Sequence, residues 1–170
     1  DRAQQYGHRA AVVLITGGRH TGKSFLARTL EGRLVADGRH AYLLDGENLR
    51  RGLDADLSEE ERGETTEMAR RYGEVARLLT DTGLIVVSTT NPFGLAYQEA
   101  SQAIRTLVHP APVIAVHMSK TEEEPPPNTD VVLSGPTDFD AATARILDEL
   151  KRRGVLAQAI GAKPVFQYSI

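Results

Sequence analysis

The feature that most constrains the fold of this chain is the stretch Gly17-Gly18-Arg19-His20-Thr21-Gly22-Lys23-Ser24. An apolar run at residues 11–15 precedes it, and residues 25–34 after it carry apolar side chains at helical spacing. The pattern G-x-x-x-x-G-K-[ST] between a strand and a helix is typical of a phosphate-binding loop. A tight glycine turn directs backbone N–H groups inward, and the start of the following helix adds unpaired donors. The stretch therefore predicts binding of a nucleotide polyphosphate.

The positions of this loop have different expected roles. We expect Lys23 to reach the β- and γ-phosphates of ATP and the Ser24 hydroxyl to hold Mg²⁺. The whole loop is predicted to bind the nucleotide through Gly17, Gly18, Arg19, His20, Thr21, Gly22, Lys23 and Ser24. Arg19 and His20 are expected to point toward solvent, with extra donation to phosphate as the alternative. A glycine-rich turn that matches by chance is the competing interpretation of the whole stretch.

Apolar runs and helical patterns alternate along the chain. Strands are predicted at residues 11–16, 41–44, 84–88, 112–116 and 131–133. Helices are predicted at residues 22–37, 58–81, 95–108 and 139–153, and residues 118–129 are predicted to form a loop. This alternation favours an α/β fold, a central parallel sheet of about five strands with helices on both faces. Ligands of such sheets bind at the carboxyl ends of the strands.

Two carboxylates follow the second predicted strand, Asp45 and Glu47. Because this strand end lies on the same rim as the phosphate loop, we expect both residues to take part in catalysis. Asp45 would position Mg²⁺ through water, together with Ser24, and the pair would accept the proton of an attacking hydroxyl. Two solvated loop carboxylates are the alternative interpretation.

Composition limits the classes of partner. The 170 residues correspond to about one domain, with 41% hydrophobic residues and a net charge of −3. There is no basic excess typical of nucleic-acid binding and no apolar run long enough for a membrane helix. The lack of cysteine is compatible with a reducing compartment, so a cytoplasmic protein is expected. The chain begins at Asp1 without methionine, and we hypothesise that residues 1–170 are a single domain of a longer multidomain protein.

Three further segments, in order after the loop, carry a family resemblance. Residues 44–53 read LDGENLRRGL, residues 70–78 read RRYGEVARL, and residues 83–88 read GLIVVS. Together they resemble the adenylylsulfate (APS) kinase family. This resemblance implies a P-loop NTPase or kinase fold. It also implies transfer of the ATP γ-phosphoryl group to the 3′-hydroxyl of APS, with ATP and Mg²⁺ as the cofactors.

The resemblance also implies an acceptor site. Arg50 matches a substrate-binding arginine, and of the helical neighbours Arg70 and Arg71 we expect Arg70 to face the site. Asn91, Pro92 and Phe93 are expected to line the acceptor pocket, where Phe93 would stack on a base. A surface arginine at position 50 and a plain turn at residues 91–93 are the alternatives.

The chain also differs from the family pattern. Glu47 stands where the family has aspartate, and the polar, proline-rich residues 119–128 replace a lid rich in lysine, arginine and aromatic residues. Two other functions therefore stay open. One is a catalytically silent nucleotide-binding domain with a regulatory or assembly role in a larger sulfate-activation protein. The other is a kinase with a different small acceptor. Other domains of the same polypeptide and further copies of the chain are the expected protein partners.

Overall fold

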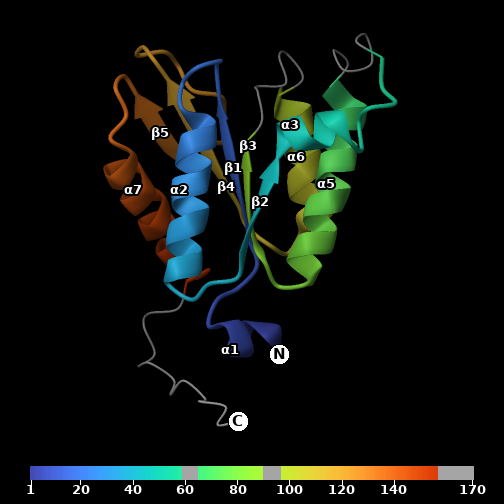
Figure 1. Ribbon diagram of the computed structural model, residues 1–170, viewed down its shortest axis with the longest axis vertical. Helices are drawn as coiled ribbons and strands as arrows, with labels where there is room; N and C mark the ends of the chain where they lie inside the picture. The colour runs from blue at the N-terminus through green and yellow to red at the C-terminus, as the bar shows by residue number, and fades with distance from the viewer. Residues whose placement is uncertain (59–64, 90–96, 157–170) are drawn as a thin grey trace, which may run out of the picture.

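Five parallel strands form the central sheet in the computed structural model, which describes residues 1–58, 65–89 and 97–156 (Figure 1). The order across the sheet is β2-β3-β1-β4-β5. The strands are β1 (Ala11–Gly17), β2 (Ala41–Asp45), β3 (Ile85–Thr89), β4 (Val113–Ser119) and β5 (Val131–Ser134). The structure therefore confirms the predicted α/β fold with a parallel sheet.

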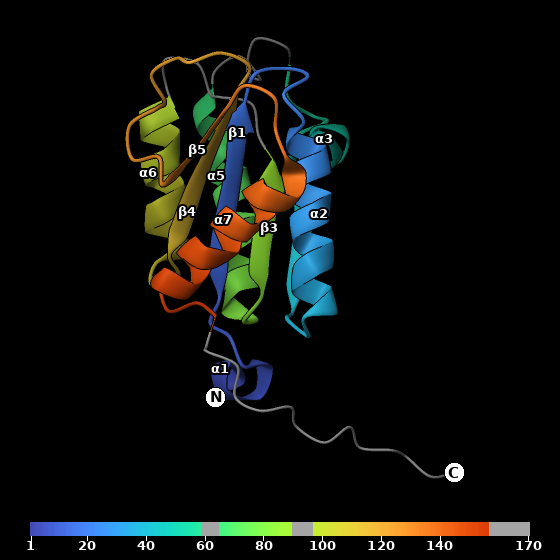
Figure 2. The same cartoon turned by 90° about the vertical axis from the view of Figure 1, so that its left-hand side faces the viewer.

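Helices cover both faces of the sheet (Figures 1 and 2). Helices α2 (Lys23–Ala36) and α7 (Phe139–Arg152) pack on one face, and α5 (Thr65–Asp81) and α6 (Tyr97–Val108) pack on the other. The two short helices are α1 (Arg2–Tyr6) and α3 (Gly46–Arg51). Within the described ranges, no helix is both long and apolar enough to cross a bilayer.

The central strand β1 supplies side chains to both layers of the core. Val13 and Ile15 pack with α2 and α7, whereas Val12 and Leu14 pack with α5 and α6. All of these side chains are fully buried, because successive residues of a strand point to opposite faces. This is why the run in the sequence is apolar throughout rather than alternating.

The strand register brings the predicted catalytic positions to one edge of the sheet. Asp45 of β2 pairs with Thr89 of β3, and Thr89 pairs with Ile15 of β1, two residues before Gly17. Neighbouring strands lie about 4.8 Å apart, so the backbones of Asp45 and Ile15 are separated by about 10 Å. The phosphate loop and the Asp45 carboxylate therefore share the carboxyl-terminal edge.

Three parts of the fold differ from the sequence prediction. Residues 46–51 form helix α3, because the Asp45 carboxylate caps it by accepting from the Glu47 N–H at 3.0 Å. The helix buries none of its side chains, so it leaves no apolar period in the sequence. Strand β4 continues through Ser119, past the predicted end at residue 116. The prediction stopped early because His117 and Ser119 are polar, although both are buried. Helix α1 was not predicted either, whereas the expected helix start at residues 59–61 lies outside the described residues.

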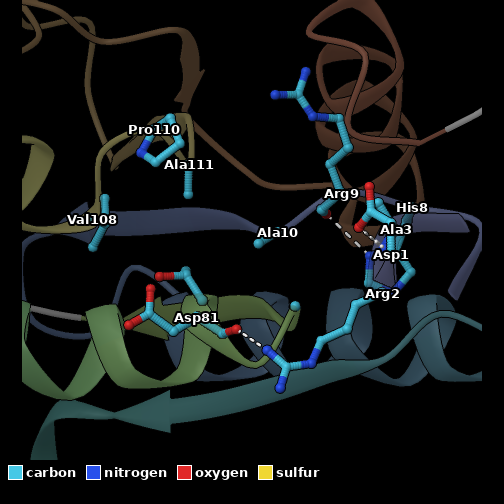
Figure 3. A pocket seen from close by; sticks show the side chains of 12 residues that line it. Asp1, Arg2, Ala3, His8, Arg9, Ala10, Asp81, Val108, Pro110 and Ala111 are labelled. Carbon is cyan, nitrogen blue, oxygen red and sulfur yellow. Dashed lines mark hydrogen bonds between the residues drawn. The ribbon is translucent and has the colours of Figure 1, made fainter. Parts of the chain in front are cut away.

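The N-terminal segment is attached below the sheet, at the edge opposite the phosphate loop (Figure 1). The His8 ring is buried, its Nδ1–H donates to the Arg9 carbonyl at 3.0 Å, and its Nε2 accepts from the His40 N–H at 3.0 Å. The Arg2 guanidinium donates to the Asp81 carbonyl, on the wall of a hollow of about 470 Å³ (Figure 3). These contacts hold residues 2–9 against the turn after α5 and the start of β2.

We predict that His8 makes the stability of the protein depend on pH. Burial lowers the pKa of His8 below its ordinary value of 6.5, and the charges of His40 and Arg39 lower it further, against the Arg9 hydrogen bond. The contribution of neutral His8 to the free energy of unfolding is therefore fully present above pH 6.5 and is lost as the pH falls below this value. The reason is that the histidine of the unfolded chain binds a proton at a higher pH than the buried one. Thermal unfolding of His8→Gln should depend less on pH than that of the unchanged protein. Removal of the exposed His109 by His109→Gln should leave this dependence unaltered.

Candidate active site

The loop at residues 17–24 joins β1 directly to α2. Gly22 is the N-cap of α2, and because glycine has no side chain, no side-chain cap occupies the N–H groups of the first turn. His20 and Gly22 have left-handed backbone angles, with φ of 59° and 94°. Left-handed residues alternating with right-handed ones turn successive N–H groups to one side and form an anion-binding concavity. The local geometry is therefore that of a phosphate cradle.

Close packing explains two of the glycines in the cradle. A Cβ atom on Gly17, which has φ of 150°, would lie 2.3 Å from the Met118 carbonyl oxygen of β4. A Cβ atom on Gly22 would lie 2.8 Å from Cζ of Phe139. The cradle is thus wedged between β4 and the start of α7, which holds its backbone in place.

Lys23 lies across the cradle. Its Nζ donates to the carbonyl oxygens of Gly17 at 2.7 Å and Gly18 at 2.6 Å. Burial lowers the pKa of the Lys23 ammonium below its ordinary value. The side chain nevertheless places a cation beside the free N–H groups of α2, where the negative charge of a polyphosphate would be held.

The other loop side chains are mostly accessible. Arg19, His20 and Ser24 are exposed, as expected for Arg19 and His20, and the Thr21 hydroxyl donates to the Gly18 carbonyl at 3.0 Å. Across the edge, Asp45 is half-buried, while the exposed Glu47 lies 3.4 Å from Nε of Arg51. Asp45 is therefore the carboxylate held rigidly at this rim, by its capping bond to α3.

Sequence reasoning did not place His117 at the site. His117 is buried at the end of β4, and its Nδ1 lies 3.1 Å from the Thr16 hydroxyl of β1. Burial lowers the pKa of His117; Glu123 opposes this effect and the charge of Lys23 adds to it. The sequence signal that applies here is that parallel strands end at one rim, because His117 lies two residues before the carboxyl end of β4, the strand next to β1.

Helices α3 and α5 lie on the side of the rim where the acceptor is expected. Gly46 lies so close to β3 that a Cβ atom there would be 2.8 Å from the Thr89 carbonyl oxygen. Arg50 is half-buried on α3 and engages in contacts within the protein. Asn91, Pro92 and Phe93 lie outside the described residues, so their predicted role stays a prediction.

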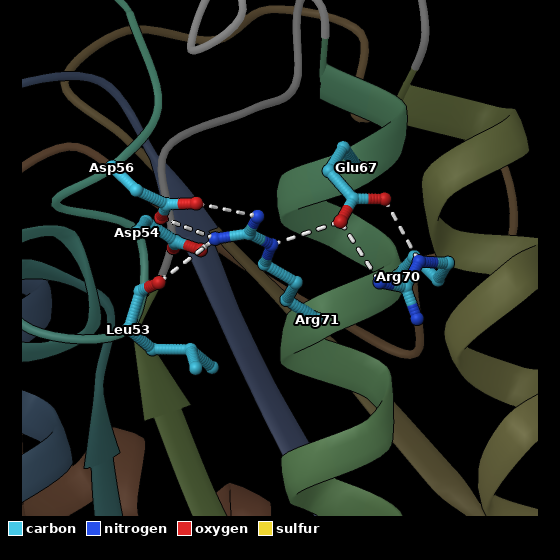
Figure 4. A network of polar contacts seen from close by, with 6 residues as sticks. All are labelled: Leu53, Asp54, Asp56, Glu67, Arg70 and Arg71. Carbon is cyan, nitrogen blue, oxygen red and sulfur yellow. Dashed lines mark hydrogen bonds and ion pairs between the residues drawn. The ribbon is translucent and has the colours of Figure 1, made fainter.

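Of the two neighbouring arginines, Arg71 is the more buried, and the expected role of Arg70 in binding an acceptor stays a prediction. Arg71 has a side chain only 19% exposed and makes a bidentate contact with Asp56, with bonds of 2.6 and 3.0 Å (Figure 4). It also donates to the Leu53 carbonyl and to Glu67, each at 2.8 Å. Arg70 is 56% exposed and pairs only with Glu67 among the contacts drawn (Figure 4). Arg71 lies toward the segment after α3, where the carboxylates of Asp54 and Asp56 are close to its guanidinium.

We predict that Arg71 holds the segment that follows α3. Arg71→Ala removes the bonds to Asp56 and Leu53 and leaves Asp54, which is 2% exposed and 3.7 Å from Arg71, without this cation. We expect the melting temperature to fall by roughly 3–8 °C. Arg70→Ala is the matched control on the same helix and should change it by less than about 2 °C. Equal effects of the two variants would contradict this role of Arg71.

Comparisons with known proteins agree with this geometry. The family model "Adenylylsulphate kinase" matches residues 9–130. The chain is 44% identical over 121 residues to the adenylyl-sulfate kinase of Shewanella amazonensis, a match that covers 70% of this chain and 58% of that protein. The chain thus spans little more than half the length of this relative.

Two solved structures have the same fold. A Cys556Ala mutant of the APS kinase of Mycobacterium tuberculosis is 31% identical, with a TM-score of 0.72, over 85% of this chain and 99% of that chain. A hexameric APS kinase from Thiobacillus denitrificans is 26% identical, with a TM-score of 0.73, over 93% of this chain and 32% of that chain. The chain therefore has the fold of these solved APS kinases over most of its length.

Proposed function

Because this chain belongs to the adenylylsulfate kinase family, we propose that it transfers the γ-phosphoryl group of ATP to the 3′-hydroxyl of adenylyl sulfate. The observation that carries the proposal is the uncapped start of α2, with the Lys23 ammonium lying across the phosphate cradle. A polyphosphate, which carries several acceptor oxygens and negative charge, matches this set of donors. As an ATP-dependent kinase, the protein would act in the cytoplasm.

The residues of the rim divide the reaction between them. The N–H groups of the cradle and Lys23 hold the β- and γ-phosphates and offset the charge that develops on the transferred group. The acceptor oxygen bonds to the γ-phosphorus, the bond from this phosphorus to the β-phosphate oxygen breaks, and ADP leaves. Asp45, with Glu47 near it, accepts the proton of the acceptor hydroxyl. Arg50 and Arg70 are proposed to bind the anionic groups of the acceptor.

A magnesium ion fits the donors at this edge. The described residues contain no group of three or more acidic, histidine or cysteine side chains that could hold a metal without help. Mg²⁺ in kinases needs only one or two protein ligands, because phosphates and water supply the rest. We propose the exposed Ser24 hydroxyl and the Asp45 carboxylate for this role. When bound, the ion neutralises charge on the β- and γ-phosphate oxygens.

The proposal is tested by release of ADP from ATP and Mg²⁺ in the presence and absence of APS. We expect release only with APS, and AMP, which lacks the sulfate, serves as the control acceptor. Release that requires a different hydroxyl compound would instead support a kinase with another small acceptor. Absence of both APS-dependent turnover and APS binding would reject the proposal.

The segment after β4 favours a second candidate, a silent nucleotide-binding domain with a regulatory or assembly role. Residues 120–130 contain one cation, Lys120, beside the acidic residues Glu122, Glu123, Glu124 and Asp130. The Ser119 hydroxyl donates to the Glu123 carboxylate and ties this segment back on itself. Such a segment supplies little positive charge to a transferred phosphoryl group. Calorimetric binding of ATP and APS without turnover would support this candidate.

The proposal also includes association with other domains and with further copies of the chain. The Thiobacillus relative is described as hexameric, and this chain covers only 32% of it. We therefore propose that residues 1–170 work beside other domains of the same polypeptide, and that copies of the chain associate. Light scattering of the full-length protein would measure the number of copies.

A further inference from the structure

Two phenylalanine rings lie in contact beside the phosphate cradle. Phe25, in the first turn of α2, is 61% exposed, more than Val35, Tyr42, Leu53 or Leu78, the other large apolar residues of the described ranges that are exposed. Its ring centroid is 4.6 Å from that of Phe139, the first residue of α7, with 56° between the ring planes. We call Phe25 and Phe139 the aromatic pair. Exposure of a ring this large costs solvation free energy unless a ligand covers it.

The aromatic pair touches the cradle itself. The Phe139 ring lies against Gly22, where an added Cβ atom would meet Cζ at 2.8 Å and Cε1 at 3.0 Å. Phe25 comes two residues after Lys23 in the same helical turn. Helix α7 begins beside the upper part of α2 and crosses the sheet obliquely from there (Figure 2). The exposed ring is therefore next to the atoms that hold phosphate.

We propose that the aromatic pair is the surface on which the base of the bound nucleotide stacks, with Phe25 as its exposed ring. This inference rests on the proposed nucleotide function. A base is joined to the α-phosphate through a single ribose, so phosphates held at the start of α2 restrict the base to the immediate surroundings of the cradle. On the β2 side these surroundings are charged, with Asp45, Glu47 and Arg50. On the α7 side Asp138 and Asp140 are charged as well, but this side also presents the aromatic pair, and a purine stacks on aromatic rings.

The inference predicts that Phe25 affects the nucleoside part of the ligand and not its phosphates. Dissociation constants are measured for ATP and for inorganic tripolyphosphate, which has no base. We expect Phe25→Ala to weaken ATP binding by about 5- to 150-fold, from the usual contribution of base stacking, and to leave tripolyphosphate binding unchanged. Val35→Ala, at a 53% exposed position near the other end of α2, is the control and should alter neither constant.

A second variant provides a direct signal. The chain contains no tryptophan, so Phe25→Trp introduces a single tryptophan at the proposed stacking surface, whose fluorescence can be excited apart from that of the tyrosines. We expect ATP to quench its fluorescence and tripolyphosphate to leave it nearly unchanged.

The outcomes separate the two proposals. If the unchanged protein binds neither ATP nor tripolyphosphate, the proposed nucleotide function fails. If it binds both and Phe25→Ala weakens neither, the stacking surface is rejected while the phosphate cradle stands. If Phe25→Ala changes only the oligomeric state and retains the affinity for ATP, the exposed ring contacts a second copy of the chain. This result would also overturn the inference.

Discussion

Replacing Lys23 by alanine is expected to lower APS-dependent release of ADP by about 10²- to 10³-fold, the usual cost of losing one preorganised donor to developing charge. The Lys23 ammonium lies 2.7 Å from the Gly17 carbonyl oxygen and 2.6 Å from that of Gly18. It is therefore held at the cradle before substrate arrives, and no other residue of the loop supplies a cation in that position. Steady-state kinetics with saturating ATP measure the loss in kcat.

Two controls make the Lys23 result specific. Lys151→Ala removes a lysine that is 61% exposed and paired with Asp148 on α7, and it should leave turnover unchanged. Thermal unfolding of Lys23→Ala should show a folded protein, because its two hydrogen bonds are made only to the loop. Full activity of Lys23→Ala would contradict the role of the cradle in phosphoryl transfer. Loss of activity in both variants would point to an effect on folding instead.

The largest effect on stability is expected from Gly17→Ala. Gly17 combines a φ of 150° with a distance of 2.3 Å from its added Cβ to the Met118 carbonyl oxygen, so alanine forces β1 and β4 apart at the cradle. Backbone strain and overpacking together should reduce the free energy of unfolding by about 2–5 kcal/mol. Denaturant titration monitored by circular dichroism measures this loss.

The chain offers a matched glycine for comparison. Gly32 lies inside α2, and a Cβ atom there would meet no heavy atom within 4 Å. Gly32→Ala should therefore raise the free energy of unfolding by about 0.5–1 kcal/mol, because alanine loses less backbone entropy in a helix. Opposite signs for the two variants are expected. A mild effect of Gly17→Ala would show that β4 does not constrain the cradle.

The local pattern of the sequence was enough to predict the layers and the cradle. Residues 11–15 form a run of apolar side chains that is typical of a strand buried on both faces, and the structure buries all of them. The loop from Gly17 to Ser24 connects this strand to a helix, as predicted. Such features depend on residues adjacent in the chain, so their chemistry is visible in the sequence. Helix α3 escaped prediction because its stability comes from a cap and an ion pair instead of an apolar period.

The sequence by itself determined that a glycine loop with the phosphate-binding pattern joins a buried strand to α2 and that Asp45 ends the next strand. Only the tertiary structure decided which side chains surround them. Arg71 turns toward Asp56, fifteen residues away, while its neighbour Arg70 does not. His117 meets Thr16 across two strands, and Phe25 meets Phe139 across two helices. The physical reason is that these contacts join segments distant in the chain, so the energies that select them exist only after the sheet has assembled.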